Sequence, residues 1–473
     1  MSALTSLSAI EMAAGIRRRD FSPVELVQAH LERIEKLNPL LNAFVRVDGE
    51  GALGAAKIAE GALGRDGEAA RLGPLHGVPL TIKSSIDVAG FPTETGTPLR
   101  RGNVPRADAT LVRRLRRAGA ILLGNSNAPE FLMAYETDNP LYGRTNNPWD
   151  LERTPGGSSG GEAAAIAARC SAGGIGSDGG GSIRIPAHFS GICGLKPTPG
   201  RIPASGHFPP SVGPFAALGV VGPMARTVGD LALLFEAVAG PDPRDSSAAP
   251  VPVRWPGEAE LRETRVGYFE EDGRVPVTRE TRAAVREAAR ALRDQKFDVE
   301  PFLPEGLEDA RRLWWTLFGP AGNLLLGPMV AGHDAEVGPV LREFLGIVRA
   351  EPPLTLESFL GTLVARDEVR ARVLEQMERR PVLLCPVCAV PAFRHRARRW
   401  EVEGRPVDYL DAMSYTQWFN LIGNPAVVVP VGRSPEGLPI GVQVVGRPHE
   451  EEVVLAVAAR IERACGRFPE PPL

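Results

Sequence analysis

Hydrophobic positions along the chain follow two periodicities, one helical and one extended. Within residues 22–38, apolar side chains recur three or four positions apart after a Ser-Pro-Val-Glu start, which predicts a capped helix that ends before Pro39. Apolar, β-branched runs at 78–82 and 121–123 predict strands, and residues 264–300 read as strand, amphipathic helix and strand. Strands that alternate with helices predict an α/β fold whose sheet is covered by helices on both faces.

Three later segments extend this pattern. The alanine-rich run after Glu162 predicts a buried helix that ends at Gly173, and residues 425–446 predict two strands joined by a Ser-Pro-Glu-Gly turn, with a closing helix over 450–465. Residues 303–380 differ, because they are helical and rich in leucine and tryptophan. Two interpretations stay open for them: a cap over a binding site, or a subdomain of core helices.

Composition narrows the class of protein. The chain has 473 residues, of which 43% are hydrophobic and 23% charged, and its formal net charge is −3. Binders of nucleic acid or of anionic membranes normally carry a basic excess, so neither is expected as a partner. No apolar run is long enough to span a bilayer, and the first residues lack the order of a secretory signal. We therefore expect a cytoplasmic protein without a membrane span.

The cysteines point to structure rather than chemistry. Their number, five, is odd and small for the length of the chain, which indicates free thiols in a reducing compartment. Cys385 and Cys388 have CxxC spacing, but no second pair or histidine cluster completes a zinc site, and the run around them reads as a strand. We expect both to be small buried side chains and expect no metal.

Lysine is used sparingly. Only five of the 54 basic residues are lysines, at positions 36, 57, 83, 196 and 296, and the rest are arginines. A lysine that loses its proton when desolvated can do what arginine cannot. Lys83 comes directly after the apolar run 78–82, where burial would favour the uncharged amine.

The densest candidate chemistry is "TPGGSSGGEAAAIAARCSAGGIGSDGGGSIRIP", residues 154–186. The spacing of 174–179 matches a dinucleotide fingerprint, but no helix opens directly after it and no acid follows at the right offset. The spacing of 156–160 matches the nucleophile elbow of α/β hydrolases, but no downstream histidine has a well-placed acidic partner. Neither motif accounts for both Gly-Ser clusters.

A third interpretation uses both clusters. A neutral lysine can activate a serine, and a remote lysine can do so through an intervening hydroxyl. No lysine here has a serine three residues earlier, which disfavours the S-x-x-K arrangement. Successive glycines before Ser182 would let backbone N–H groups converge on an oxyanion, although a Gly-rich connector without chemistry is the simpler alternative.

These segments together resemble the amidase signature family. The likeness rests on "GGSSGGEAAA…GSDGGGSIRIPAHFSGICGLKPT", on "LHGVPLTIKSSIDVAGFPTETGT", on "NAPEFLMAYETDNPLYGRTNNPWD" and on "TQWFNLIGNPAVVVPVGRSPEGLPIGVQVVGRPHEEE". It implies a single domain over residues 1–473, with a mixed central sheet covered by helices on both faces, and it places the signature core at 60–240. The likeness thins between about residues 250 and 400, which include the helical segment 303–380.

The resemblance also implies roles for individual residues. Lys83 would be the base, Ser182 the nucleophile, and Ser158, in a cis peptide after Gly157, the bridging serine of a Ser–Ser–Lys triad. The oxyanion hole would be the backbone of Gly179, Gly180, Gly181 and Ser182. The supporting residues would be Ser159, Asp178 and Arg184. The residues that bind substrate would be Phe131, Leu132 and Met133. The chain departs from many members by having Ser84 after the lysine and Arg379-Arg380 before the strand near 383.

The implied activity is hydrolysis of amide bonds through an acyl-enzyme, without metal or organic cofactor. The expected partners are small amides with apolar or aryl groups, and also esters and carbamates (urethanes), acted on by a monomer or homodimer. The alternative is an amidotransferase subunit that acts only in a complex. The tyrosine-rich run usual in that subunit is replaced here by "PGRIPASGHFPP", which argues against that role.

Overall fold

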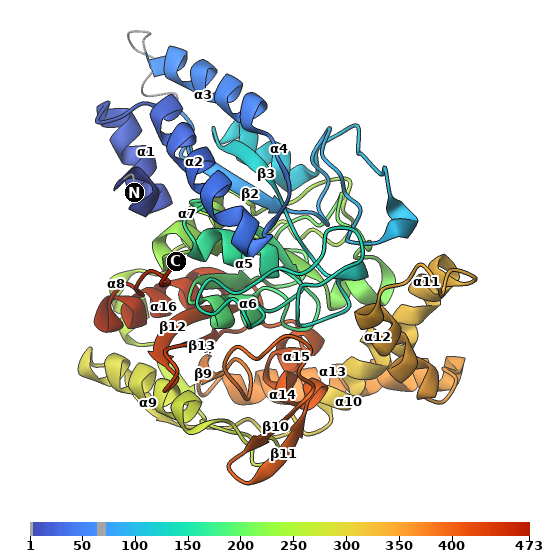
Figure 1. Cartoon of the computed structure of the whole chain (residues 1–473). Coiled ribbons are helices and arrows are strands. Elements are labelled where there is room, and N and C mark those ends of the chain that lie inside the picture. Colours follow the sequence, from blue (N-terminus) through green and yellow to red (C-terminus); the bar gives the residue numbers. More distant parts are fainter. Residues whose placement is uncertain (1–2, 64–71) are drawn as a thin grey trace.

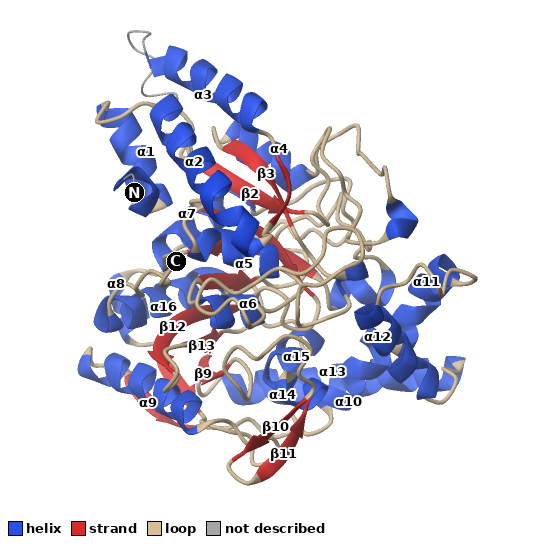
Figure 2. Ribbon diagram, viewed as in Figure 1, coloured by secondary structure: helices blue, strands red, loops and turns tan. Residues whose placement is uncertain are grey.

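The centre of the molecule is a mixed sheet of eleven strands, in the spatial order β1-β3-β2-β4-β6-β5-β12-β13-β9-β7-β8. Figures 1 and 2 show strands β2, β3, β9, β12 and β13 of this sheet with helices around them. The computed structural model describes residues 3–63 and 72–473. The strands are β1 (Phe44–Val47), β2 (Pro79–Lys83), β3 (Ile121–Ser126), β4 (Gly173–Asp178), β5 (Cys193–Lys196), β6 (Val220–Ala225), β7 (Arg265–Tyr268), β8 (Asp298–Pro301), β9 (Val382–Pro386), β12 (Ala426–Arg433) and β13 (Pro439–Val445). Because strands from both ends of the chain join one sheet, the expected single α/β domain is confirmed.

Helices cover both faces of this sheet, and a hairpin of β10 (Arg399–Val402) and β11 (Arg405–Asp408) stands apart from it. The helices are α1 (Ala9–Arg18), α2 (Pro23–Leu41), α3 (Gly49–Leu63), α4 (Thr110–Arg117), α5 (Gly160–Ala167), α6 (Arg184–Ser190), α7 (Val228–Val238), α8 (Glu258–Arg262), α9 (Arg279–Asp294), α10 (Ala310–Phe318), α11 (Pro320–Val330), α12 (Pro339–Ala350), α13 (Leu356–Met377), α14 (Tyr409–Ala412), α15 (Ser414–Leu421) and α16 (Glu451–Cys465). Short 3₁₀ helices lie at Ala3–Ser6, Pro98–Arg100, Glu130–Leu132 and Gly213–Ala217.

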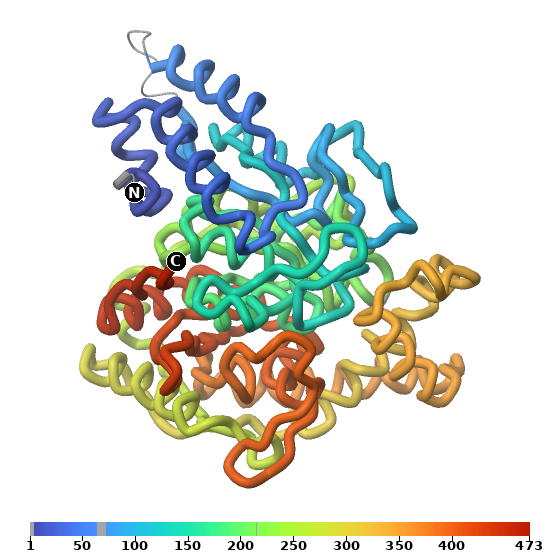
Figure 3. Tube along the Cα trace, in the orientation of Figure 1, coloured from blue at the N-terminus to red at the C-terminus, as the bar shows by residue number. Residues whose placement is uncertain are grey.

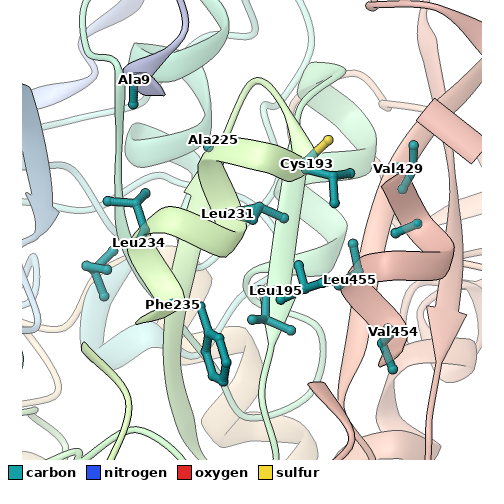
Figure 4. Close-up of a cluster of buried hydrophobic side chains, with 14 of the residues drawn as sticks. Ala9, Cys193, Leu195, Ala225, Leu231, Leu234, Phe235, Val429, Val454 and Leu455 are labelled. Atoms are coloured by element: carbon teal, nitrogen blue, oxygen red, sulfur yellow. The ribbon is translucent and has the colours of Figure 1, made fainter. Parts of the chain in front are cut away.

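Alternation along the buried strands divides the core into two main layers. In β12, Val427 and Val429 enter one hydrophobic cluster, whereas Val428 enters the cluster on the opposite face. Successive side chains of a strand point to opposite faces, so a strand covered on both sides reads as a continuous apolar run. Figure 4 shows the first cluster, where Leu234 from α7 and Leu455 from α16 approach the sheet.

Two helix ends differ from the sequence prediction. Helix α2 runs through Pro39 and ends at Leu41, and the next residue, Asn42, caps it with a left-handed backbone (φ 50°) and an N–H bond to the Asn38 carbonyl. Helix α5 ends at Ala167, because Arg169 adopts φ 59° and turns the chain, so Gly173 begins strand β4 instead of ending a helix. Proline and glycine alone were misleading markers at both places.

The helical segment 303–380 forms α10 to α13 and lies at one side of the molecule, shown in gold to orange in Figure 3. It contacts the rest of the fold through α10, which packs on α15, through α12, which packs on the 3₁₀ helix Glu130–Leu132, and through α13, from which Arg366 donates to the Leu421 carbonyl. Near the opposite side, the two ends of the chain come together, and Arg467 Nη2 lies 2.8 Å from Glu11 Oε1. Within the described residues, no helix is long and apolar enough to cross a bilayer.

Candidate active site

Lys83 ends strand β2 and is completely buried. Its Nζ lies 2.6 Å from Ser158 Oγ, 3.0 Å from Ser159 Oγ and 3.0 Å from Ser177 Oγ. Parallel pairing of β2 with β4 brings Ser177 to this position, while Ser158 and Ser159 arrive on the segment before α5. The structure therefore joins the predicted base to the predicted bridging serine, Ser158, and to the predicted supporting serine, Ser159, and adds the hydroxyl of Ser177.

Burial decides the charge of this lysine. Desolvation lowers the pKa of Lys83 well below its ordinary value of 10.5, and the nearby Asp178 and Glu162 carboxyls only partly oppose it. Burial also raises the pKa of Glu162 to about 7, although its carboxyl accepts hydrogen bonds from Thr81 and Ser126. The amine is therefore shifted toward its neutral form, which can accept a proton.

The two predicted reacting serines meet at one cavity. Ser158 follows a cis peptide bond after Gly157, as the family resemblance implies. The Ser159 N–H donates to the Ser182 carbonyl at 3.1 Å, which ties the two Gly-Ser segments together. Ser158 and Ser182 both line the cavity, but among the described residues their hydroxyls form no hydrogen bond with each other. Catalytic hydrogen bonds are often long without substrate and tighten when it binds.

Asp178 and Arg184 brace the loop between β4 and α6. Both are fully buried side chains, and Arg184 Nη2 lies 2.9 Å from Asp178 Oδ1 while Arg184 Nε donates to Oδ2 at 3.0 Å. Burial opposes the charge on Asp178, but the Arg184 guanidinium outweighs it and lowers the pKa of the carboxyl. Arg184 also donates to the Thr416 carbonyl and the Gln443 side chain, so a buried network fixes the loop.

The glycine loop itself differs in one respect from the prediction. The Gly181 N–H donates to Asp178 Oδ1 at 2.7 Å and is therefore already occupied. Among the described residues, the N–H groups of Gly179, Gly180 and Ser182 have no such partner. Gly181 instead supplies backbone freedom, since its φ of 130° is one that other residues rarely adopt.

The cavity above the serines has two apolar arms. The first, with about 810 Å³ of empty space, reaches from Ser158 and Ser182 toward Phe208, Phe215 and Leu326. The second, with about 550 Å³, reaches from Ser182 toward Trp314 and Phe344. The predicted substrate-binding residues Phe131, Leu132 and Met133 all lie on its walls. Ser182 is the predicted reacting group that faces both arms.

Helices α10, α11 and α12 supply one wall of this cavity. Side chains from all three helices line one arm or both, among them Trp314, Phe318, Leu325, Leu326, Met329, Val340, Phe344 and Ile347. Neither interpretation of the segment 303–380 is sufficient alone, because Trp314 is 2% exposed and belongs to the core while Leu325 is 50% exposed.

The other sequence motifs hold no second site. The 174–179 glycines lie largely in strand β4, with no helix start for a pyrophosphate. His207 lines the first arm, but its Nδ1 lies 2.8 Å from the Pro209 carbonyl, and none of the carboxylates that the structure describes bonds to its ring. Burial lowers the pKa of His207 to about 4. Cys385 and Cys388 are buried, and the described residues include no cluster that could hold a metal ion.

Several site residues were not found from the sequence. Ser177 could have been found only by knowing that β2 and β4 are neighbours, since its own motif marks it as a loop residue. Trp314 and Asn420 contact the glycine loop from segments 135 and 242 residues away in the chain. Their signals, an aromatic pair and an asparagine in a helical run, are common in ordinary cores.

Comparison with known proteins shows the family to which the chain belongs. The family model described as Amidase matches residues 25–455, which is most of the chain. The chain belongs to the amidase family. Enzymes of this family hydrolyse amide bonds, and the resemblance inferred from the sequence is confirmed.

The names of individual relatives of this amidase describe different activities. A glutamyl-tRNA(Gln) amidotransferase subunit of Salinispora arenicola is 35% identical over all of both chains. Indoleacetamide hydrolase of Bradyrhizobium diazoefficiens is 35% identical over 97% of this chain and 86% of its own length. Among solved structures, a bacterial aryl acylamidase of the amidase signature family superposes with a TM-score of 0.82 at 27% identity, covering 98% of this chain and 97% of its own.

Proposed function

We propose that this amidase is a serine hydrolase in which Lys83, Ser158 and Ser182 act as a Ser–Ser–Lys triad. The observation that carries the proposal is the 2.6 Å contact between Lys83 Nζ and Ser158 Oγ, made by an amine whose pKa burial holds well below 10.5. Ser159 and Ser177 fix the amine from the other sides. A lysine amine that contacts three hydroxyls and whose burial favours the uncharged form is suited to act as a general base.

The reaction proceeds in two halves. Lys83 accepts the Ser158 proton as Ser158 accepts the Ser182 proton, and Ser182 Oγ bonds to the substrate carbonyl carbon. When the tetrahedral intermediate collapses, the carbon–nitrogen bond breaks and the relay returns the proton to the leaving nitrogen. Water then adds to the acyl-enzyme through the same relay, releasing the acid and restoring the Ser182 hydroxyl.

The oxyanion hole consists of the backbone at the end of β4. The N–H groups of Gly179, Gly180 and Ser182 are the proposed donors, and Gly181 contributes the turn, since its own N–H binds Asp178. Donors that are held in place before the reaction stabilise charge as it develops in the transition state. Asp178, Arg184 and Ser159 support this loop through their hydrogen bonds.

The substrate is an apolar or aryl amide, with esters and carbamates as further substrates. This rests on the apolar lining of both arms, including Phe131, Leu132 and Met133, and on helices α10 to α12, which we propose cap the site. The indole and aryl groups in the names of two relatives are of the same chemical kind. A panel of p-nitroanilides with acyl chains of different lengths measures this preference directly.

The test of the nucleophile is Ser182→Ala. Turnover of a p-nitroanilide by the purified protein is expected to fall by about 10⁴-fold or more, because removing a catalytic serine leaves only binding and oxyanion stabilisation. The thermal unfolding midpoint should stay near that of the wild type, since the hydroxyl replaced is not part of the core. Activity that survives this change would contradict the assignment.

A second candidate, a subunit that works only within an amidotransferase complex, is favoured by the full-length relationship to the Salinispora amidotransferase protein. The two candidates differ in whether the chain acts alone. Hydrolysis of an anilide by the isolated chain supports the first. Absence of hydrolysis across the panel, with Ser182 still open to a fluorophosphonate label, supports the second.

A further inference from the structure

Each peptide group that carries a proposed oxyanion donor is fixed by a hydrogen bond to its carbonyl oxygen, on the edge opposite the donor N–H. In a planar trans peptide the carbonyl oxygen and the N–H of the next residue point in opposite directions, so a partner on the carbonyl sets the direction of that N–H. The Asp178 carbonyl, behind the Gly179 N–H, accepts from Asn420 Nδ2 at 3.2 Å. The Gly181 carbonyl, behind the Ser182 N–H, accepts from the Ile185 N–H at 2.7 Å.

The middle donor is fixed by a tryptophan. The Gly179 carbonyl accepts from Trp314 Nε1 at 2.8 Å, and the N–H on the opposite edge of that peptide belongs to Gly180. The next carbonyl, that of Gly180, accepts from Tyr135 and Thr416, but the N–H on its opposite edge is the Gly181 N–H that binds Asp178. Within the described part of the chain, the Trp314 bond is therefore the only one that links helices α10 to α13 to a peptide carrying a proposed oxyanion donor.

Trp314 is itself held in one position. It is 2% exposed, and its ring stacks on Phe318 with centroids 4.7 Å apart and an angle of 16°. A Cβ placed on Gly180 would lie 2.4 Å from Trp314 Cζ2, so ring and loop touch closely. An indole that stacks on Phe318 and touches the Gly180 backbone has little freedom to move its N–H away from the Gly179 carbonyl.

We propose that Trp314 is a positioning residue for the oxyanion hole, which it serves by holding the Gly179–Gly180 peptide with the Gly180 N–H directed at the substrate oxygen. The inference rests on the proposed function. By this inference, the helical segment 303–380 affects the rate of the reaction as well as lining the cavity. Because the same ring lines the second arm, the wall that receives the substrate also sets the geometry of the loop that stabilises the transition state.

The experiment removes the indole N–H and keeps the ring. Position 314 is filled with β-(3-benzothienyl)alanine by amber suppression, and Trp314→Phe is made beside it. Loss of a direct oxyanion donor costs about a hundredfold to a thousandfold in kcat, so misalignment of one donor is expected to cost about tenfold to a hundredfold, with KM changed less than about twofold. The matched control is Trp149→Phe, which removes an indole bond to the Ser190 carbonyl outside the cavity.

A second readout separates positioning from general loss of structure. A peptidyl or aryl aldehyde that adds to Ser182 places an oxyanion in the hole, so its inhibition constant should rise by the same factor as kcat falls, while the carboxylic acid product binds unchanged. A variant at position 314 that keeps kcat and aldehyde affinity within twofold of the wild type overturns the inference, as does a loss confined to KM. If Trp314→Phe fails to fold, the isosteric variant decides.

Failure of this inference is distinct from failure of the proposed function. A wild-type protein that hydrolyses none of the anilides contradicts the proposed function, and the inference falls with it. An active wild-type protein whose variants at position 314 keep their kcat contradicts the inference alone.

Discussion

The cavity has a floor and a wall that are built in opposite ways. The floor, formed by the ends of β2 and β4 and by residues 154–186, consists of polar side chains that are almost fully buried: Lys83 and Arg184 are 0% exposed and Ser158 is 1% exposed. The wall, formed by α10 to α12, includes apolar side chains that reach solvent, such as Leu325 at 50% and Met329 at 37%. The charged and polar groups of the floor are therefore buried, whereas part of the apolar wall is exposed to solvent.

This reversal fits the two tasks. Buried polar groups are costly unless each has its partners, and the floor supplies them through short, mutually dependent hydrogen bonds. Such a network has one arrangement, which suits groups that must act on a single atom. Partly exposed apolar side chains lose little when they move, which suits a surface that accepts several substrates. The floor is therefore the more rigid of the two regions, and the exposed part of the wall is the more tolerant of change.

The largest difference should appear when an ion pair is broken in each region. Asp178→Asn leaves the Arg184 charge buried without its partner, and the free energy of unfolding is expected to fall by about 3–5 kcal/mol. Asp334→Asn removes a wall pair with Arg349, 3.3 Å apart and mostly exposed, and should cost less than about 1 kcal/mol. Urea unfolding of both variants measures the two values.

Equal costs for these two variants would contradict the comparison. Asp334 serves as the matched control, because it is changed to the same residue and its partner is also an arginine. A shift in the urea midpoint without a change in slope shows that only stability differs.

The floor was largely predictable from the sequence, because most of its residues lie close together along the chain. Ser158, Ser182 and the glycines before it lie in one continuous stretch, so their spacing alone points to a reactive loop. Lys83 was indicated by the scarcity of lysine and by the apolar strand before it. The bond of Asn420 to the Asp178 carbonyl could not be predicted, because it joins residues 242 positions apart and depends on the order of strands in the sheet.

The wall was predictable only as secondary structure. Leucine and tryptophan at helical spacing indicate helices over 303–380, and four helices are present there. Which faces turn to the cavity follows from how α10 packs on α13 and α15, and the sequence has no local marker for that packing. In the sequence, Trp314 therefore resembles an ordinary core residue, and its bond to the Gly179 carbonyl could not be predicted.

A smaller effect is expected from trimming the wall. Met329→Ala enlarges the first arm, and kcat/KM for a long-chain anilide should fall by about tenfold, whereas that for acetanilide-sized substrates should not change. Because Met329 is partly exposed, stability should stay within about 0.5 kcal/mol of the wild type. Leu324→Ala, on the same helix but 64% exposed, is the matched control. Equal losses for short and long substrates would show that the wall acts on chemistry rather than on fit.

The smallest effect is a pH response of two fully buried lysines, Lys83 at the end of β2 in the floor and Lys196 at the end of the nearby strand β5. Burial lowers the pKa of Lys196 from 10.5 to about 7, assisted by the Arg184 charge and opposed by Asp178 and Glu451, and the pKa of Lys83 moves in the same direction. Above about pH 7 the unfolded chain therefore binds more protons than the folded one, and the free energy of unfolding rises with pH.

The free energy of unfolding should rise only over a narrow range of pH, and a lysine substitution can show which groups cause the rise. Glu162, with a pKa raised to about 7, acts in the opposite direction below that pH, and thiols such as Cys388 begin to oppose the rise only near their ordinary value of 9. Between about pH 7 and pH 8, one such lysine contributes about 1 kcal/mol, which Lys196→Met should remove from the slope of stability against pH. The wall contains no lysine, so Asp334→Asn should leave the slope unchanged. A wild-type slope of zero would mean that these lysines keep their protons when buried, and a neutral Lys83 would lose its physical basis.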